Sequence, residues 1–256
     1  MRILLSNDDG VYARGLAALA AAFPDDEVWI VAPDREQSAS SHSITLARPL
    51  RVTELGPRRY AVDGTPTDAV YMGLNLVLRW RRPDLVVSGV NHGPNLGNDV
   101  LYSGTVAAAM EGALLGVNAI AVSLAGAPTN DFEHAAAFAA ALARRVAQTP
   151  PGAPALLNVN VPPGPVRGYR FARLGKRTYG NEVVEGTDPR GRKYYWIGGA
   201  GAANEDIPHS DCNAVFKDGL ASVTPIHLDW SHDALLSMMR SWTVEGYDKE
   251  PSLDGA

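Results

Sequence analysis

Residues 1–10 read MRILLSNDDG, and the rest of the chain is organised around them. The apolar run ILL is short and continuous, which is typical of a strand buried on both faces. Ser6 and Asn7 follow the run, and the next two residues, Asp8 and Asp9, can share one target only if the backbone turns there, which the glycine after them permits. Adjacent carboxylates repel each other unless a cation lies between them, and a hard divalent cation prefers oxygen ligands. The alternative is that Asn7, Asp8 or Asp9 caps the following helix.

Apolar runs alternate with segments of helical spacing along the first 165 residues. Strands are expected at 3–5, 28–32, 84–90, 119–124 and 155–161, with short strands within 44–63. Helices are expected at 15–23, 69–78, 106–115 and 131–148. Thr67 or Asp68 is expected to cap the second helix. Strand, helix and strand at this spacing form βαβ units, so the pattern predicts an α/β fold with a parallel sheet.

The alternation of strand and helix patterns ends near residue 165. Beyond it, the segments 169–174, 193–197 and 221–226 resemble strands, and the loops between them are rich in Gly and charge. An amphipathic helix is expected at 232–242. We therefore expect one domain over 1–256, made of four parts: an α/β core at 1–165, a hairpin extension at 166–230, a C-terminal helix at 231–247 and a disordered tail at 248–256.

The bulk properties exclude several classes of protein. The 256 residues carry a net charge of −5, so no global basic field recruits nucleic acid. The single cysteine, Cys212, excludes an internal disulfide and a CxxC metal site. The N-terminus lacks the features of a signal peptide, and no apolar run reaches transmembrane length. We expect a cytoplasmic protein with no nucleic-acid partner and no membrane segment.

Polar segments follow three predicted strands at the point where each strand ends. They are the Asp8–Asp9 pair, the loop 38–43 and the segment 91–105. Carboxyl ends of parallel strands meet at one edge of a sheet, where ligands bind. Two carboxylates, several hydroxyls, amides and many glycines suit a hard cation beside a phosphate. The SGT turn at 103–105 is expected to offer N–H groups and hydroxyls at a helix N-terminus, where an anion is favoured.

Several common phosphate and catalytic motifs are absent from the sequence. No GxxxxGK[ST] loop occurs, which excludes a Walker NTPase. No GxGxxG follows the first strand, which argues against a dinucleotide cofactor. No GxSxG elbow occurs, which argues against a hydrolase serine. Metal-assisted hydrolysis of a phosphoester remains, in which a cation polarises the phosphoryl oxygen and lowers the pKa of a bound water.

Six motifs stand in chain order: MRILLSNDDG, APDREQSASSHSITL, GTPTDAV, SGVNHGPNLGNDVLYSGTVAAAMEG, DPRGRKYYWIGG and LASVTPI. They resemble the SurE survival-protein nucleotidases over nearly the whole chain. The resemblance implies a Rossmann-like, mostly parallel sheet with helices on both faces. It also implies a C-terminal β-hairpin extension and terminal helix used in oligomerisation, as a homodimer or homotetramer. The implied activity is that of a 5′-nucleotidase, a metal-dependent phosphatase of nucleoside 5′- and 3′-monophosphates. Some members also trim short polyphosphate.

The resemblance also assigns residues by position. It implies one divalent cation per subunit, Mg²⁺ or Mn²⁺, with the ligands Asp8, Asp9, Ser38 and Asn91. It implies that the phosphate pocket is lined by Asn95, Ser103, Gly104 and Thr105. The choice of Ser38 over the other serines of its loop rests on the resemblance alone. Asp8 and Asp9 are the expected catalytic residues. Either aspartate could take the proton of a metal-bound water, or one could form an aspartyl-phosphate, and the sequence leaves both mechanisms open.

Three positions depart from the family pattern. His92 stands where a small residue is usual beside the metal-binding asparagine. We interpret it as a tolerated substitution that points elsewhere, and a proton donor to the leaving group is the alternative. His42 replaces a more usual asparagine and is expected to be solvated in its loop. Arg14 stands where a proline-glycine turn is common, which leaves the start of the first helix open.

Two other functions compete with the nucleotidase. One is a binding module that holds a nucleotide as a signal without hydrolysing it. The acidic pair argues against it, because a phosphate binder gains nothing from carboxylates without a metal. The other is a phosphatase for polyphosphate or a sugar phosphate, which a substrate panel distinguishes.

The apolar residues of segment 193–197 suggest self-assembly. Its tyrosines, tryptophan and isoleucine would leave apolar surface in water if the chain were a monomer. The pattern therefore predicts a homodimer or a higher oligomer. The alternative is that this hairpin folds back on its own core.

Overall fold

The computed structural model describes residues 1–126, 131–149, 154–180, 182–198 and 202–247. The chain divides into two compact units, Met1–Ile226 and His227–Ala256. The second unit contains helix α5 (Asp233–Met239), within the helix expected at 232–242. The tail expected to be disordered, 248–256, lies outside the described residues. Within the described parts of the chain, no helix combines the length and hydrophobicity that a bilayer crossing requires.

Nine strands of the described chain form one sheet in the order β3-β4-β2-β1-β5-β6-β7-β13-β8. The parallel strands are β1 (Arg2–Ser6), β2 (Glu27–Pro33), β4 (Arg59–Val62), β5 (Leu85–His92), β6 (Ala119–Leu124) and β7 (Leu156–Val161). One edge adds β3 (Val52–Gly56), antiparallel to β4. The other edge adds β13 (Ala221–Pro225), antiparallel to β7, and β8 (Tyr169–Phe171), parallel to β13. The predicted mostly parallel α/β sheet is confirmed.

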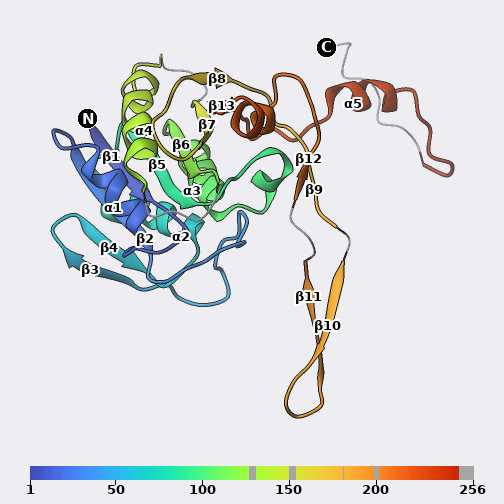
Figure 1. Ribbon diagram of the computed structural model, residues 1–256, viewed down its shortest axis with the longest axis horizontal. Coiled ribbons are helices and arrows are strands. Elements are labelled where there is room, and N and C mark those ends of the chain that lie inside the picture. Colours follow the sequence, from blue (N-terminus) through green and yellow to red (C-terminus); the bar gives the residue numbers. More distant parts are fainter. Residues whose placement is uncertain (127–130, 150–153, 181, 199–201, 248–256) are drawn as a thin grey trace. The chain divides into compact units, whose positions relative to one another are not determined.

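Helices cover both faces of this sheet (Figure 1). On one face α1 (Arg14–Ala21) packs against α4 (Glu133–Val146), and on the other α2 (Pro66–Met72) packs against α3 (Gly104–Leu114). Successive strand residues alternate between the two layers, because Ile3 and Leu5 join the α1–α4 core. Leu4 instead approaches Gly73 at the end of α2. The apolar run of β1 is continuous because both of its faces are covered.

The start of α2 differs from the sequence prediction. Its N-cap residue is Thr65 and not Thr67 or Asp68. The Thr65 hydroxyl accepts from the Asp68 backbone N–H at 3.1 Å, while the Asp68 carboxylate accepts from the Thr65 N–H at 2.9 Å. This reciprocal capping box, with Pro66 in the first turn, begins the helix before residue 69. A π-helical turn (Gly73–Val77) then continues from α2.

The C-terminal extension contains two small antiparallel pairs (Figure 1). Strands β10 (Val183–Thr187) and β11 (Lys193–Ile197) form a hairpin, and β9 (Arg177–Thr178) pairs with β12 (Ala203–Asn204). The apolar side chains of β11 are exposed, from 46% at Tyr194 to 98% at Ile197. A π-helical turn (Asn213–Lys217) precedes β13. The hairpin thus offers the apolar surface from which we expect self-association.

Candidate active site

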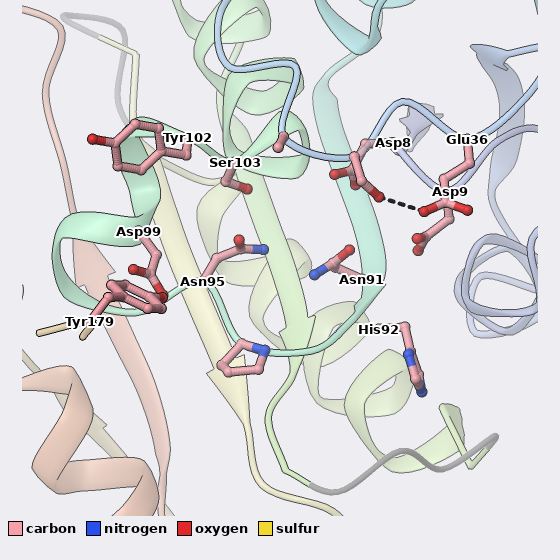
Figure 2. A pocket seen from close by; sticks show the side chains of 13 residues that line it. Asp8, Asp9, Glu36, Asn91, His92, Asn95, Asp99, Tyr102, Ser103 and Tyr179 are labelled. Atoms are coloured by element: carbon pink, nitrogen blue, oxygen red, sulfur yellow. Dashed lines mark hydrogen bonds between the residues drawn. The ribbon is translucent and has the colours of Figure 1, made fainter. Parts of the chain in front are cut away.

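A cavity of about 490 Å³ lies at the carboxyl edge of the sheet, beyond the ends of β1, β2 and β5 (Figure 2). Strand β1 lies between β2 and β5, and the helices that follow β1 and β5 lie on opposite faces. Such a switch point opens a crevice between the strand ends. Six of the predicted site residues line the cavity: Asp8, Asp9, Ser38, Asn91, Asn95 and Ser103.

Asp8 is a nearly buried carboxylate, only 6% exposed. Its Oδ1 atom accepts a hydrogen bond from the hydroxyl of Thr105. Burial raises the pKa of Asp8 to about 6; the Thr105 hydrogen bond opposes this rise and the negative charge of Asp9 adds to it. A nearby cation would reverse this effect, because it favours the ionised carboxylate.

Asp9 lies next to a second source of negative charge. Burial raises the pKa of Asp9, a hydrogen bond from the His92 backbone lowers it, and the charge of Glu36 raises it. Glu36 lines the same cavity. This end of the cavity therefore concentrates three carboxyl groups, Asp8, Asp9 and Glu36, from two strand ends.

The helix-capping alternative for Asn7, Asp8 or Asp9 is wrong. The N-cap of α1 is Ala13, which has no side-chain capping bond, and Arg14 is the first helical residue. The chain bends at Asp8 and Asp9 and takes a φ of +97° at Gly10, so the carboxylates precede the helix by several residues. The two carboxylates are therefore positioned by the end of β1 and not by a helix terminus.

Asn91 reaches the cavity through an irregularity in β5. The register between β5 and β6 shifts between Ser88 and Asn91. At Gly89, whose φ is +132°, an added Cβ would lie 2.3 Å from the carbonyl oxygen of Val122. Such a bulge re-aims the next side chain. The Asn91 Nδ2 donates to the Gly93 carbonyl at 2.9 Å, which leaves its Oδ1 as the atom available to a cation.

Ser38 extends from the loop after β2. Its hydroxyl donates to Glu36 Oε1 at 2.6 Å, so a cation would bind the remaining lone pairs of the Ser38 oxygen. Glu36 was not among the predicted site residues. The available signal was a third acidic side chain two positions before Ser38, at the same strand end.

The predicted metal ligands therefore offer only oxygen atoms: two carboxylates, one amide and one hydroxyl. This donor set fits a hard divalent cation such as Mg²⁺ or Mn²⁺. Over the described residues, no group of three or more His, Cys, Asp or Glu side chains is arranged to hold a metal. Neutral oxygens from Ser38 and Asn91 would thus be needed to complete a site built on Asp8 and Asp9.

Of the four residues predicted to line the phosphate pocket, two line the cavity and two lie behind it. Asn95 and Ser103 line it, and the Ser103 hydroxyl also accepts from the Val106 N–H at 3.0 Å as the N-cap of α3. Thr105 is completely buried and donates to Asp8. An added Cβ at Gly104 would lie 2.8 Å from the Cβ of Asp8. A direct contact of Gly104 or Thr105 with phosphate stays a prediction.

Two buried amides in β7 hold Asn95 in place and were not predicted. The Asn95 N–H donates to Asn160 Oδ1 at 2.8 Å, and the Nδ2 atoms of Asn158 and Asn160 donate to the Asn95 carbonyl. The Asn95 side chain donates to the Ser123 hydroxyl at 2.8 Å. The sequence signal was the asparagine at every second position of an apolar strand.

The two unusual histidines lie close to the site. His92 lines the cavity, and its ring packs edge-on against Phe132 with centroids 6.1 Å apart. His42 is exposed in its loop, as expected, and it also has a partner within the protein. Its Nε2 lies 2.9 Å from Oε2 of Glu111, a buried residue of α3, because the loop after β2 lies against that helix.

The comparisons with known proteins agree with this fold. The family model described as "Survival protein SurE" matches residues 3–181. The chain belongs to the SurE family. A protein of Anaeromyxobacter dehalogenans (strain 2CP-1 / ATCC BAA-258) named "5′-nucleotidase SurE" is 78% identical over 98% of this chain and 100% of its own length. One of the same name from Myxococcus xanthus (strain DK1622) is 55% identical over 100% of this chain and 98% of its own.

A solved structure gives the same assignment to the SurE family. The SurE protein from Aquifex aeolicus superposes with a TM-score of 0.81 at 38% sequence identity, covering 94% of this chain and 98% of its own. The resemblance drawn from the six sequence motifs is thus confirmed.

Proposed function

We propose that this protein is a 5′-nucleotidase, a phosphoric monoester hydrolase that releases phosphate from nucleoside monophosphates and uses one divalent cation per subunit. The observation that carries the proposal is the convergence of Asp8, Asp9, Ser38 and Asn91, from three strand ends, on one cavity. The name "5′-nucleotidase SurE" on relatives 78% and 55% identical to this chain supports it.

The acidic pair would hold the cation, Mg²⁺ or Mn²⁺, with Ser38 and Asn91 completing the oxygen donors. When bound, the cation supplies Lewis-acid polarisation of a phosphoryl oxygen. Both aspartates have pKa values raised first by burial, so a cation would stabilise their ionised form. Thr105 holds the Asp8 carboxylate in position through its hydroxyl.

The protein's own groups would orient the phosphate and move one proton. Asn95 and Ser103 line the middle of the cavity and would bind phosphate oxygens. One of the two aspartates would take the proton of the attacking water as a general base. An aspartyl-phosphate is the alternative, and trapping of phosphorylated protein by acid quench during turnover would distinguish it.

We also propose further substrates, an assembly and a location for this protein. The same cavity would accept 3′-monophosphates, and short polyphosphate would be a side substrate. The exposed apolar face of β11 supports a homodimer or homotetramer built through the hairpin extension. The one cysteine, buried and unpaired at Cys212, fits a cytoplasmic location.

A metal add-back assay tests the proposal. Phosphate release from AMP, GMP and ribose 5-phosphate is measured with EDTA and then with Mg²⁺ or Mn²⁺. Wild type, Asp8→Asn and the matched surface control Asp25→Asn are compared. Asp8→Asn should lose roughly a hundredfold or more in rate, since it removes a catalytic carboxylate, and the control should lose nothing. Activity that ignores chelation would reject the metal-dependent reaction, and AMP recovered intact with every cation would favour the binding module.

A further inference from the structure

The cavity has a second end that the acidic pair does not explain. Figure 2 shows Asp99, Tyr102 and Tyr179 at the end opposite the acidic pair, and Asn95 and Ser103 between the two ends. We call Asp99, Tyr102 and Tyr179 the tyrosine end. A ligand that spans the cavity would therefore meet carboxylates, then an amide and a hydroxyl, and then two aromatic rings.

The two tyrosine rings are available to a ligand. Tyr102 is 66% exposed and Tyr179 is 54% exposed, although both line the cavity. The guanidinium of Arg177 lies 5.6 Å from the centre of the Tyr179 ring, so the ring already has one cationic neighbour. Exposed aromatic rings in a polar cavity suit a planar aromatic group, because stacking needs only a π-face.

The tyrosine end is held together by polar bonds between two distant segments. The Tyr179 hydroxyl donates to Asp99 Oδ2 at 2.7 Å, and the Arg177 guanidinium pairs with the same oxygen. The backbone N–H of Arg177 donates to Asn98 Oδ1 at 2.7 Å. These bonds fix the C-terminal extension against the 3₁₀ helix Gly97–Leu101, which carries Asp99.

A buried carboxylate connects the same two segments, the start of the 3₁₀ helix and the start of the C-terminal extension. Asp211 is fully buried and accepts from the backbone N–H groups of Gly97, at 2.9 Å, and Gly175, at 2.7 Å. An added Cβ at Gly97 would lie 2.8 Å from the Gly175 carbonyl oxygen, so the two segments meet where a side chain would not fit. Because these bonds within the protein hold the arrangement in place, binding would spend little free energy on ordering it.

Asp99 retains an acceptor for a sugar hydroxyl. Arg177 and Tyr179 both use its Oδ2, and no hydrogen bond among the described residues engages Oδ1. The Arg177 charge balances the Asp99 carboxylate, so this end does not repel a ligand that carries a phosphate. The cavity volume, about 490 Å³, lies within the range of small-molecule sites.

We infer that the tyrosine end binds the nucleoside half of the substrate. Tyr102 and Tyr179 stack on the base, Asp99 Oδ1 accepts a ribose hydroxyl, and the phosphate reaches the acidic pair. This inference rests on the proposed nucleotidase function. Since every base offers a π-face to the two rings, the four common nucleoside monophosphates should be turned over within about tenfold of each other.

The test compares a substrate that has a base with one that lacks it. We expect Tyr102→Ala and Tyr179→Ala each to lower kcat/KM for AMP about tenfold, the lower part of the range for one stacked base. The value for ribose 5-phosphate should stay within about twofold of wild type. The control Tyr169→Ala removes a ring of similar exposure, 57%, that lies outside the cavity. It should leave kcat/KM unchanged for both substrates. Tyr179→Phe, which keeps the ring, should retain most of the preference for AMP.

A binding measurement separates this inference from the phosphatase proposal. Equilibrium dialysis of adenosine needs no hydrolysis, and adenosine should bind the alanine variants about tenfold more weakly than wild type. If neither AMP nor ribose 5-phosphate is hydrolysed but adenosine binds wild type more tightly than the alanine variants, the nucleoside site is supported and the phosphatase proposal is rejected. The inference would be overturned if the alanine variants lost kcat/KM equally for AMP and ribose 5-phosphate, or if the ratio of the two values did not change. It would also be overturned if adenosine did not bind, or if the substitutions left its affinity unchanged. Far-UV circular dichroism confirms that each variant is folded.

Discussion

Replacement of Asp8 by asparagine should stabilise the metal-free protein at pH 8, although it should abolish activity. The substituted amide would keep an oxygen to accept from Thr105 but would remove a buried charge. The folded-state pKa of Asp8, about 6, lies above the usual 3.8 of an unfolded chain. The protonated carboxyl therefore contributes stability that is fully present below pH 3.8 and is lost as the pH rises through 6.

The size of the effect follows from the difference between the two pKa values. A change from 3.8 to about 6 corresponds to about 3 kcal/mol of folding free energy. Asp8 is only 6% exposed, so solvent screens this cost little. For a unit of this size, about 3 kcal/mol corresponds to a shift of roughly 6–12 °C in the thermal midpoint. Wild type and variant should differ little at pH 4, where the carboxyl is largely protonated.

Thermal and urea unfolding in EDTA at pH 4 and pH 8 measures this difference. Adding Mg²⁺ should erase the advantage of the variant, because a cation at 100 times its Kd adds about 2.7 kcal/mol to the wild type alone. The exposed control Asp25→Asn should show no pH-dependent difference. The reasoning would be refuted if Asp8→Asn were less stable than wild type at pH 8 in EDTA. It would also be refuted if the stability difference between the two proteins were the same at pH 4 and pH 8.

Two further substitutions test the supports behind Asp8. Thr105→Val removes the donor that lowers the pKa of Asp8, so the acid limb of the pH–rate profile should move to higher pH; Thr105→Ser should restore it, and an unmoved limb would contradict this role. Gly104→Ala would place a Cβ 2.8 Å from the Asp8 Cβ and should weaken Mg²⁺ binding about tenfold by calorimetry. Gly112→Ala, on the same helix but against the core, should lower the thermal midpoint and leave Mg²⁺ affinity unchanged.

The local features of the fold could be predicted because short-range patterns carry them. A strand covered on both faces must be apolar at every position, as the run in β1 is, and a helix repeats its apolar residues along one stripe. The boundary of α2 was missed because two alternatives compete within four residues. Thr65 and Asp68 cap each other reciprocally, so the first polar residue of the pair and not the last begins the helix.

The roles of individual site residues depended on contacts between distant segments. The sequence indicated that Thr105 belongs to the site, but its partner lies 97 positions away, at Asp8. Similarly, Tyr179 belongs to the cavity only because Asp99 and the buried Asp211 hold the extension in place. Nothing in the spacing of these residues marks such contacts.

The sequence by itself determined the parallel α/β sheet and the polar strand ends at Asp8–Asp9, 38–43 and Asn91, because periodicity is a local property, whereas the choice of Ser38 within its loop came from the family resemblance. Only the tertiary structure decided which atoms support the carboxylates and what forms the opposite end of the cavity. The pKa of Asp8 depends on how deeply it is buried and which hydroxyl reaches it. Burial is a property of the packed chain, so no stretch of sequence specifies it alone.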